Sequence, residues 1–303
     1  MKLSELEDFI AVADTGSIRA AAKRRGITSP AMTQSIARLE ESLHVPLIVR
    51  TTRGAVLSDY GRAFLLRARL IINEVTRSAD EMAQMRGVGG GQITIGSSMT
   101  PTSTVIPRAI AEFRRTHPDT RVNIVAGMFH EHVPRIRSGA MDFALGPLPA
   151  TGIGTEFEVE RLFDNDLVLT ARKGNPHAAA KSLLELANAD WILGGPASHG
   201  PGAAVVDMFE QAGHPAPRIM VQSSSLSVMQ ALMLDSDAIC ALPRPLVAAD
   251  PLRRHVVTID VAEKMPTYSV SLFQRANWPL SPAANDLATL LRRQAHYWRT
   301  RTT

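Results

Sequence analysis

Hydrogen-bonding side chains gather on one face of the segment 28–43, TSPAMTQSIARLEESL. At about 100° per residue, one side of a helix here would carry Pro30, Thr33, Gln34, Ala37 and Arg38. These groups are small or form hydrogen bonds, and one of them is a cation. The sequence therefore predicts a polar helix face that can lie against another surface.

The opposite side of the same segment is apolar at helical spacing. The repeat runs at intervals of four, three and four through Met32, Ile36, Leu39 and Leu43. Such a stripe is typical of a helix that buries one side. Thr28 or Ser29 can cap the helix, and Pro30 near its first position needs no N–H. These features predict a helix whose apolar side is buried and whose polar side is exposed to solvent.

A second helix is expected just before this one, in the segment SIRAAAKRRGI. Ser17 is a candidate N-cap, the three alanines favour a helix, and Gly26 suits the left-handed conformation that ends one. Small alanines let two helices cross closely, so Ile18 and Ile27 should be buried against the apolar stripe. The pattern predicts a helix-turn-helix, although similar helix pairs also occur in proteins that do not bind DNA.

Positive charge is concentrated around these helices. Between Arg19 and Arg69 there are ten Lys and Arg residues against three Asp and Glu, whereas the whole chain has a net charge of +4. A concentrated basic region suits a phosphate backbone, although it can also serve solubility alone. After Pro46, the segment LIVRTTRGAVLS has apolar ends around a basic, hydroxyl-bearing centre, which predicts a hairpin that forms a wing.

The first sixty or so residues resemble the winged helix-turn-helix of the bacterial LysR-type transcriptional regulators. The resemblance rests on LEDFIAVADTGSI, the AAA segment, SPAMTQSIARLEESL, PLIVRTTRG and LSDYG. It implies that the helix over 28–43 enters the major groove of DNA by its N-terminal half, while the wing reaches the flanking minor groove and phosphates. By this resemblance, the residues that face DNA are Thr28, Ser29, Pro30, Thr33, Gln34 and Arg38, and those that contact the backbone or minor groove are Arg50, Thr51 and Arg53.

Two positions depart from the usual pattern of that family. Glutamine is usual where this chain has Ser29, and arginine is common where it has Gln34. Arginine reads guanine with two hydrogen bonds, whereas glutamine suits adenine. We therefore expect Gln34 to read bases, and Arg50 and Arg53 to position the protein on the DNA.

The composition is that of an ordinary globular protein, 45% hydrophobic and 20% charged over 303 residues. No apolar run approaches the roughly eighteen residues of a membrane span, and the N-terminus lacks the pattern of a signal peptide. A cytoplasmic protein that does not enter the membrane is expected. The single cysteine, Cys240, excludes an internal disulfide; we expect a buried strand residue there, with a redox switch as the alternative.

Residues 59–86 are expected to form one long coiled-coil linker helix. Heptad spacing connects Phe64, Ala68, Ile71, Val75, Ser78, Met82 and Met85. A helix this long cannot bury its whole apolar row within a sixty-residue domain. We therefore expect the row to pack against a second copy of the chain. Packing onto the chain's own effector domain is the alternative. A homodimer would present two DNA-reading helices to repeated half-sites, and the family resemblance extends it to a homotetramer.

The segment GVGGGQ ends that helix, and its glycines are expected to form a hinge. They precede a strand rather than follow one, so a dinucleotide-binding motif is rejected. The expected domains are residues 1–58 for DNA binding, 59–86 for the linker helix, 87–91 for the hinge and 92–303 for effector binding.

Beyond residue 92, strands and helices alternate in a parallel α/β pattern. Strands are expected at QITIG, RVNIVAG and MDFAL, and at 167–171, 191–193, 219–222, 238–242 and 268–274; helices are expected at 103–115, 132–138 and 282–298. This part resembles the periplasmic-binding-protein-like effector domain of the same family, in which two α/β subdomains flank a cleft. Subdomain I is assigned residues 92–163 and 267–303, and subdomain II residues 164–266. The fold class is therefore multidomain, α followed by α/β.

Ligands in such sheets bind beyond the carboxyl ends of the strands, and the hydroxyl-rich segment SSMTPTST directly follows the first strand. These hydroxyls suit a carboxylate or sulfonate, with ordinary N-capping as the alternative, and Arg244 could add charge. The segments GMFHEHVPRIRSGAMDFAL and PGAA resemble the branch of the family that responds to aromatic sulfonates or carboxylates. The candidate effector-binding residues are Ser97, Ser98, Met99, Thr100, Thr102, Gly127, Met128, His130, Gly195, Pro196, Ser198, Ser223 and Ser224.

No catalytic, metal or cofactor site is expected. The HEH segment at 130–132 lacks the spacing of zinc proteases, and Ser198 lacks the preceding glycine of a nucleophile elbow. The expected partners are double-stranded DNA, a small organic anion, further copies of the chain and, as a possible one, RNA polymerase. The competing classes are a solute-binding protein or small α/β enzyme with unrelated N-terminal helices, and an architectural DNA binder, which would leave some two hundred residues unexplained.

Overall fold

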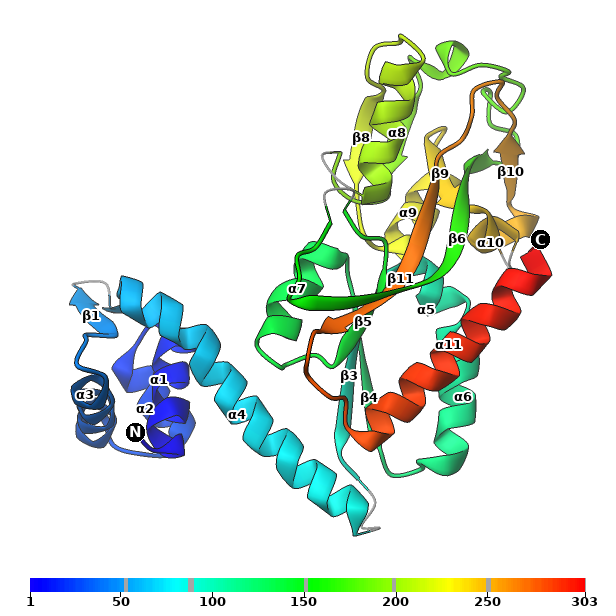
Figure 1. Cartoon of the computed structure of the whole chain (residues 1–303). Coiled ribbons are helices and arrows are strands. Elements are labelled where there is room, and N and C mark those ends of the chain that lie inside the picture. The colour runs from blue at the N-terminus through cyan, green and yellow to red at the C-terminus, as the bar shows by residue number, and fades with distance from the viewer. Residues whose placement is uncertain (52–53, 87–89, 150–151, 198–199, 249–251, 303) are drawn as a thin grey trace. The chain divides into compact units, whose positions relative to one another are not determined.

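A computed structural model describes residues 1–51, 54–86, 90–149, 152–197, 200–248 and 252–302 (Figure 1). These residues form two compact units. The first contains the elements up to Met85 together with the short segment 134–141, and the second contains the other described residues. Most of the predicted hinge, residues 87–89, lies outside the described residues.

Three helices open the chain: α1 (Leu3–Thr15), α2 (Ile18–Arg25) and α3 (Ser29–Leu43). The Ser17 side chain accepts the N–H of Ala20 at 3.3 Å and so caps α2, which ends at Gly26 with φ +69°. Thr28, rather than Ser29, caps α3, because its Oγ1 accepts the N–H of Ala31 at 3.3 Å. The predicted helix-turn-helix is confirmed in position and in its caps.

The apolar stripe of α3 lies in the core of the first unit. Met32, Ile36 and Leu39 are buried beside side chains of α1, including Phe9. Ile18 packs against the edge of this core, but Ile27 is 38% exposed, so the prediction that Ile27 is buried was wrong. Ile27 lies in the turn after Gly26, where its N–H donates to Ala22, and the apolar stripe begins only at Met32.

The predicted wing is a two-stranded hairpin of β1 (Ile48–Thr51) and β2 (Gly54–Leu57), in which Thr51 pairs with Gly54. The start of β2 lies against the end of α1, where Gly16 O accepts the N–H of Ala55 at 2.9 Å. A Cβ at Gly54, whose φ is +129°, would lie only 2.6 Å from the same carbonyl oxygen. This close approach requires glycine at position 54.

Helix α4 (Asp59–Met85) contains the predicted heptad row, but the row has two different environments. Phe64, Ala68 and Ile71 pack into the core of the first unit, with the Phe64 and Phe9 ring centroids 5.7 Å apart. Val75, Ser78, Met82 and Met85 are exposed. The prediction of one continuous seam for a partner was therefore wrong for its first half, because α1 already covers that half.

Strands of the second unit form a nine-stranded mixed sheet within the described residues, in the order β4-β3-β5-β11-β6-β9-β7-β8, with β10 paired to β6 (Figure 1). The pairs of β3 with β4 and β5, and of β7 with β8 and β9, are parallel. The pairs made by β6 and β11 are antiparallel, so the prediction of a parallel sheet was wrong for these two strands. The strands are β3 (Gln92–Ser97), β4 (Arg121–Ala126), β5 (Phe143–Gly146), β6 (Phe157–Arg172), β7 (Asp190–Leu193), β8 (Arg218–Gln222), β9 (Ile239–Pro243), β10 (Val256–Ile259) and β11 (Thr267–Arg275).

Helices cover this sheet and create separate hydrophobic cores along it. One core contains Ile95, Phe113 and Leu287, and another contains Trp191 and Phe209. Strand β6 runs from the first core, at Phe163, into the second, at Leu167. The helices are α5 (Met99–Ser103), α6 (Ile106–Thr116), α7 (Phe129–Arg137), α8 (Gly200–Gln211), α9 (Leu226–Leu234), α10 (Arg244–Ala248) and α11 (Pro282–Thr302).

None of the helices that the structure describes combines the length and apolar character needed to cross a bilayer.

Candidate nucleic-acid interface and ligand cleft

The open face of α3 has the composition that the sequence predicted. Pro30, Gln34 and Arg38 are exposed, and Ser29 and Thr33 are half-buried. Thr28 is exposed at the start of the helix, although its hydroxyl already serves as the cap. The structure thus brings these six predicted DNA-facing residues onto one helix, with donors and acceptors toward solvent.

One ion pair and one hydrogen bond to buried carboxylates hold α3 against α1. Arg38 Nε donates to Oε1 of the buried Glu5 at 3.3 Å, so the Arg38 side chain is anchored although half of it is exposed. The buried Asp8 accepts Ser35 Oγ at 2.6 Å and Arg25 Nε at 3.0 Å. One carboxylate of α1 therefore joins α2 and α3 and fixes the angle of the open face.

Sequence reasoning missed this pair of acids and overestimated the local charge. Helix α1 contributes Glu5, Glu7, Asp8 and Asp14, and residues 1–69 as a whole contain eleven Lys and Arg against seven Asp and Glu. Glu5 and Asp8 were detectable as acids that alternate with Leu6 and Phe9 in the first helix. Among the described side chains of residues 1–69, the cations that make no ion pair are Lys2, Arg19, Lys23 and Arg67.

The wing is fixed to the end of α3 by a single side chain. Glu40 Oε1 accepts the N–H of Leu47 at 2.7 Å and that of Ile48 at 2.9 Å, at the entry to β1. Thr51 Oγ1 donates to Gly54 O across the hairpin at 3.1 Å. Arg53 and the side chain of Arg50 lie outside the described residues, so their predicted contacts stay predictions.

Two cavities of about 390 and 270 Å³ lie at the carboxyl ends of β3, β4 and β8, and both include Ser224. Together we call them the serine cleft. Of the candidate effector-binding residues, the serine cleft includes Ser97, Ser98, Met99, Thr102, Gly127, Met128, His130, Gly195, Pro196, Ser223 and Ser224. Its other lining residues, which were not among the individually named candidates, are Ser103, Ala126, Glu131, Gln222, Ser225, Leu226, Ser227 and Gln230. Four of them lie in the serine-rich segment 222–227, QSSSLS, whose hydroxyls the sequence offers as further donors, and Ser103 lies in SSMTPTST.

Two candidates are placed differently. Thr100 is buried, and its hydroxyl bonds to the Tyr268 hydroxyl at 3.2 Å instead of lining the serine cleft. Thr100 is the second residue of α5, two positions after Ser98, so its side chain lies on the opposite face of the helix from that of Ser98. Ser198 lies outside the described residues.

Hydroxyl groups after β3 form a small network of their own. Thr102 Oγ1 lies 2.8 Å from both Ser97 Oγ and Ser98 O. Ser98 stands at the start of α5 but makes no capping hydrogen bond with its side chain, which lines the cleft. Ordinary N-capping therefore does not account for Ser98. Because α5 has only five residues, its dipole is a minor attraction for an anion.

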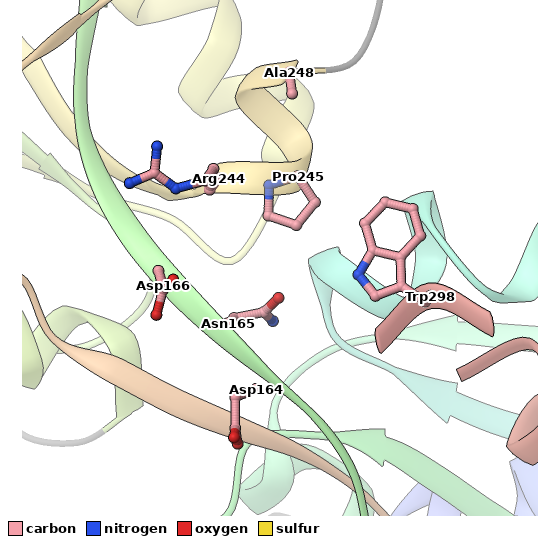
Figure 2. A pocket seen from close by; sticks show the side chains of 7 residues that line it. All are labelled: Asp164, Asn165, Asp166, Arg244, Pro245, Ala248 and Trp298. Atoms are coloured by element: carbon pink, nitrogen blue, oxygen red, sulfur yellow. The ribbon is translucent and has the colours of Figure 1, made fainter. Parts of the chain in front are cut away.

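The described lining of the serine cleft contains no Lys or Arg. Its carboxylate, Glu131, accepts the backbone N–H of Met128 at 2.7 Å. Arg244, considered as an added charge, lines a different cavity (Figure 2). A ligand of this cleft would therefore be held by hydroxyl, amide and backbone donors.

Neither a metal site nor a reactive thiol is present among the described residues. They contain no group of three His, Cys, Asp or Glu side chains able to hold a metal ion. Cys240 is fully buried in β9, and this burial raises the pKa of its thiol to about 12. The expectation of a buried strand cysteine is confirmed, and the redox alternative has no accessible thiolate to act through.

Comparison with known proteins matches both parts of the chain. Residues 3–62 match the family model of the bacterial regulatory helix-turn-helix protein, lysR family, and residues 86–296 match the LysR substrate binding domain. The chain is 26% identical over 295 residues to the HTH-type transcriptional regulator GbpR of Azospirillum brasilense, covering 96% of this chain and 86% of GbpR. It is 24% identical over 293 residues to the SDS degradation transcriptional activation protein of a Pseudomonas species, covering 95% of each.

Solved structures show the same fold. CbnR, a LysR family transcriptional regulator, matches with a TM-score of 0.70 at 24% identity, covering 97% of this chain and 99% of CbnR. Full-length CbnR complexed with its target DNA matches with the same TM-score and identity, covering 97% of this chain and all of CbnR.

The Glu40 contact predicts a stability effect. Glu40→Ala leaves two backbone N–H groups at the entry to the wing without their acceptor, which should lower the free energy of unfolding by about 1–3 kcal/mol. Urea denaturation of the full chain measures this change. The matched control is Glu41→Ala, at an exposed neighbouring position, where we expect a change within about 0.5 kcal/mol. Equal effects of the two substitutions would contradict the assigned role of Glu40.

The burial of Cys240 predicts a slow thiol reaction. Because its pKa is raised to about 12, the thiol stays protonated as the pH rises from 7 to 9, and burial also blocks the reagent. Alkylation by iodoacetamide should therefore be negligible in the native chain at both pH values and rapid in urea. Fast labelling of the native chain would show an accessible thiolate.

Proposed function

The chain belongs to the LysR family of bacterial transcriptional regulators, which bind DNA and carry an effector-binding domain, and we propose which of its residues perform each task. The proposal assigns DNA reading to the open face of α3 and backbone contact to the wing. It assigns effector binding to the serine cleft. The observation that carries it is the exposed polar face of α3, fixed between α1 and a hairpin.

At the DNA, the N-terminal half of α3 enters the major groove. Gln34 is exposed there and carries both a donor and an acceptor, which suits the edge of adenine. Thr28, Ser29 and Thr33 add hydroxyl contacts, and Arg38, anchored by Glu5, adds a cation. Arg50, Thr51 and Arg53 of the wing segment contact phosphates or the minor groove beside it. The CbnR fold, which this chain shares, has been solved with its target DNA.

The exposed second half of α4 supports a homodimer. Val75, Met82 and Met85 are large apolar side chains that are 46%, 52% and 72% exposed. An antiparallel or parallel copy of α4 would cover them, giving two DNA-binding units per assembly. A homotetramer would pair two such dimers. We retain residues 1–58, 59–86, 87–91 and 92–303 as the functional divisions, with subdomain I at 92–163 and 267–303 and subdomain II at 164–266.

The effector we propose is a small organic anion, a carboxylate or sulfonate, in the serine cleft. Hydroxyls of Ser98, Ser103 and Ser224 and the amides of Gln222 and Gln230 are donors on different walls of the cleft. One relative is named the SDS degradation transcriptional activation protein, and dodecyl sulfate is likewise an organic anion. Binding alters promoter binding only if it favours one arrangement of the subunits over another.

The relatives are named as transcriptional regulators, and we propose that this chain likewise acts without catalysis. It would act in the cytoplasm, at promoters, with RNA polymerase as a partner during activation. A solute-binding protein with unrelated N-terminal helices is the competing function, and it would bind the anion without binding duplex DNA.

DNA binding is tested by two separate alanine substitutions, one of a residue proposed to read bases and one of a residue proposed to contact phosphates. Gln34→Ala should relax the preference for the operator over unrelated duplex DNA, because only base contacts carry sequence information. Arg53→Ala should weaken binding to all duplexes about equally and reduce the slope of log affinity against log salt by about 1. Fluorescence anisotropy over a range of salt concentrations, on an operator selected from genomic fragments, measures both effects. An unchanged preference in Gln34→Ala would remove its base-reading role.

Effector binding is tested in the serine cleft with matched substitutions. Ser98→Ala and Ser224→Ala each remove a donor, and the affinity for an anion selected from a panel of carboxylates and sulfonates should fall about tenfold for each. Ser182→Ala, outside the cleft, is the control. Calorimetry on the full chain measures the affinities. Undiminished binding by both cleft variants would exclude this cleft as the site.

A further inference from the structure

The serine cleft has two compartments of different character, which meet at Ser224. The larger one, of about 390 Å³, contains the apolar side chains of Met99 and Leu226 beside its hydroxyls, and we call it the apolar compartment. The smaller one, of about 270 Å³, contains the Glu131 carboxylate and the Gln222 amide, and we call it the polar compartment. A ligand that fills both compartments must carry a different chemical group at each end.

An unsatisfied hydroxyl marks the acid-binding end, in the apolar compartment. Ser98 is 7% exposed, and its Oγ makes no hydrogen bond to any residue that the structure describes. The N-terminus of the nine-residue helix α9 lines the same compartment, and Ser225 does not cap it with its side chain. The first backbone N–H groups of α9 are therefore donors at the positive end of that helix. Together with the buried Ser98 hydroxyl, they suit one carboxylate or sulfonate group.

Glu131 lies at the other end of the cleft, beyond the neighbouring strand. Strands β3 and β4 end side by side, and Ser97 O accepts the N–H of Gly127 at 3.1 Å. The next N–H along the chain, that of Met128, donates to Glu131 Oε2 at 2.7 Å. Because neighbouring strands lie about 4.8 Å apart, the side chains of Ser98 and Glu131 are separated by a distance on the order of 5–10 Å. A single ring or a short chain spans this distance.

The Glu131 carboxylate keeps one oxygen available. Its Oε2 holds the N–H of Met128 just before α7, whereas Oε1 accepts no hydrogen bond from the described residues. The described lining of the cleft contains no Lys or Arg that could neutralise this charge. A second acid group of a ligand would be repelled here, because like charges at close range disfavour each other. A hydroxyl group can instead donate a charge-assisted hydrogen bond to Oε1.

The surroundings of Glu131 favour a hydroxyl over an ammonium group. Gln222 and Ser224 line the same compartment, and both side chains can donate hydrogen bonds as well as accept them. A hydroxyl can donate to Glu131 and also accept from one of these side chains. An ammonium group has no lone pair, so it leaves their donors without a partner, and it gains little from a carboxylate as exposed as that of Glu131.

We propose that the ligand of the serine cleft is a hydroxylated monoanion and that Glu131 is the residue that selects it. The acid group lies at Ser98 and the start of α9, the ring or chain lies against Met99 and Leu226, and the hydroxyl donates to Glu131. The cleft therefore excludes diacids of the same length. This assignment rests on the proposed effector site and adds the second functional group of its ligand.

Calorimetry on the full chain, with ligands that differ only at one end, tests the assignment. The sets are benzoate, 4-hydroxybenzoate and terephthalate; hexanoate, 6-hydroxyhexanoate and adipate; and benzenesulfonate, 4-hydroxybenzenesulfonate and 1,4-benzenedisulfonate. In at least one set, we expect the hydroxyl to strengthen binding about tenfold over the unsubstituted acid, and the second acid group to weaken it about tenfold.

The variant Glu131→Gln keeps an oxygen for the N–H of Met128 but removes the charge. We expect it to reduce the preference for the hydroxyl from about tenfold to about twofold. It should also bind the diacid at least as tightly as the unsubstituted acid, because the glutamine amide can donate to an acid group. Glu185→Gln is the matched control, since Glu185 is an exposed carboxylate outside the cleft that accepts the N–H of Lys181 at 3.2 Å. Its ligand preferences should equal those of the wild-type chain.

The outcomes separate the role of Glu131 from the proposed effector site. Suppose that the unsubstituted acids bind and that Ser98→Ala weakens them. No gain from the hydroxyl, or the same gain in Glu131→Gln, would then overturn the role of Glu131 and leave the effector site in place. Tighter binding of 4-(aminomethyl)benzoate than of 4-hydroxybenzoate would overturn the choice of a hydroxyl. Absence of binding by all three sets at millimolar concentration would overturn both the ligand class and the role of Glu131.

Discussion

Burial of the apolar stripe of α3 is the constraint on which the DNA-binding unit depends. Met32, Ile36 and Leu39 occupy its core, and their burial leaves Gln34 and its neighbours on the open side. Hydrophobic burial alone fixes which face is hidden but permits some rotation of the helix. The hydrogen bond from Ser35 to the buried Asp8 removes that freedom, because a desolvated carboxylate tolerates little departure from its partners. Hydrophobic burial therefore drives the packing of α3, and the hydrogen bond between Ser35 and Asp8 fixes its rotation about the helix axis.

The effector unit depends in a similar way on one long strand. Strand β6 pairs with β11 in its first part and with β9 and β10 in its second, so it connects the cores that would otherwise be independent. The serine cleft lies where chain segments of different cores meet. A ligand bound at such a place would act on the arrangement of the cores as well as on the residues that it touches.

Features that rest on local chemistry were predictable from the sequence. The caps at Ser17 and Thr28, the end of α2 at Gly26 and the hairpin after Pro46 follow from the backbone preferences of single residues. The serine-rich segments after β3 and β8 were recognised because hydroxyls cluster there. Features that rest on distant contacts were not predictable. The exposed, charged first half of β6 conceals its strand pattern, and nothing in the heptad row shows that α1 covers Phe64 and Ala68.

Because only the first half of α4 is buried, the length of this helix sets the distance between the DNA-binding core and the contact with a second copy. Its inner half is part of the DNA-binding core, and its outer half, from Val75 to Met85, is the part left for a second copy. The helix from Val75 to Met85 rises by about 15 Å, so the middle of this outer half lies more than two helical turns beyond Ile71, which packs against the core. Adding seven residues in this outer half would preserve the phase of the apolar row and move the joint by about 10 Å, whereas adding four would rotate it by about 40°. The length of α4 would therefore set the spacing of the two half-sites that a dimer binds. Insertions or deletions of seven residues would change this spacing while keeping the apolar row in phase.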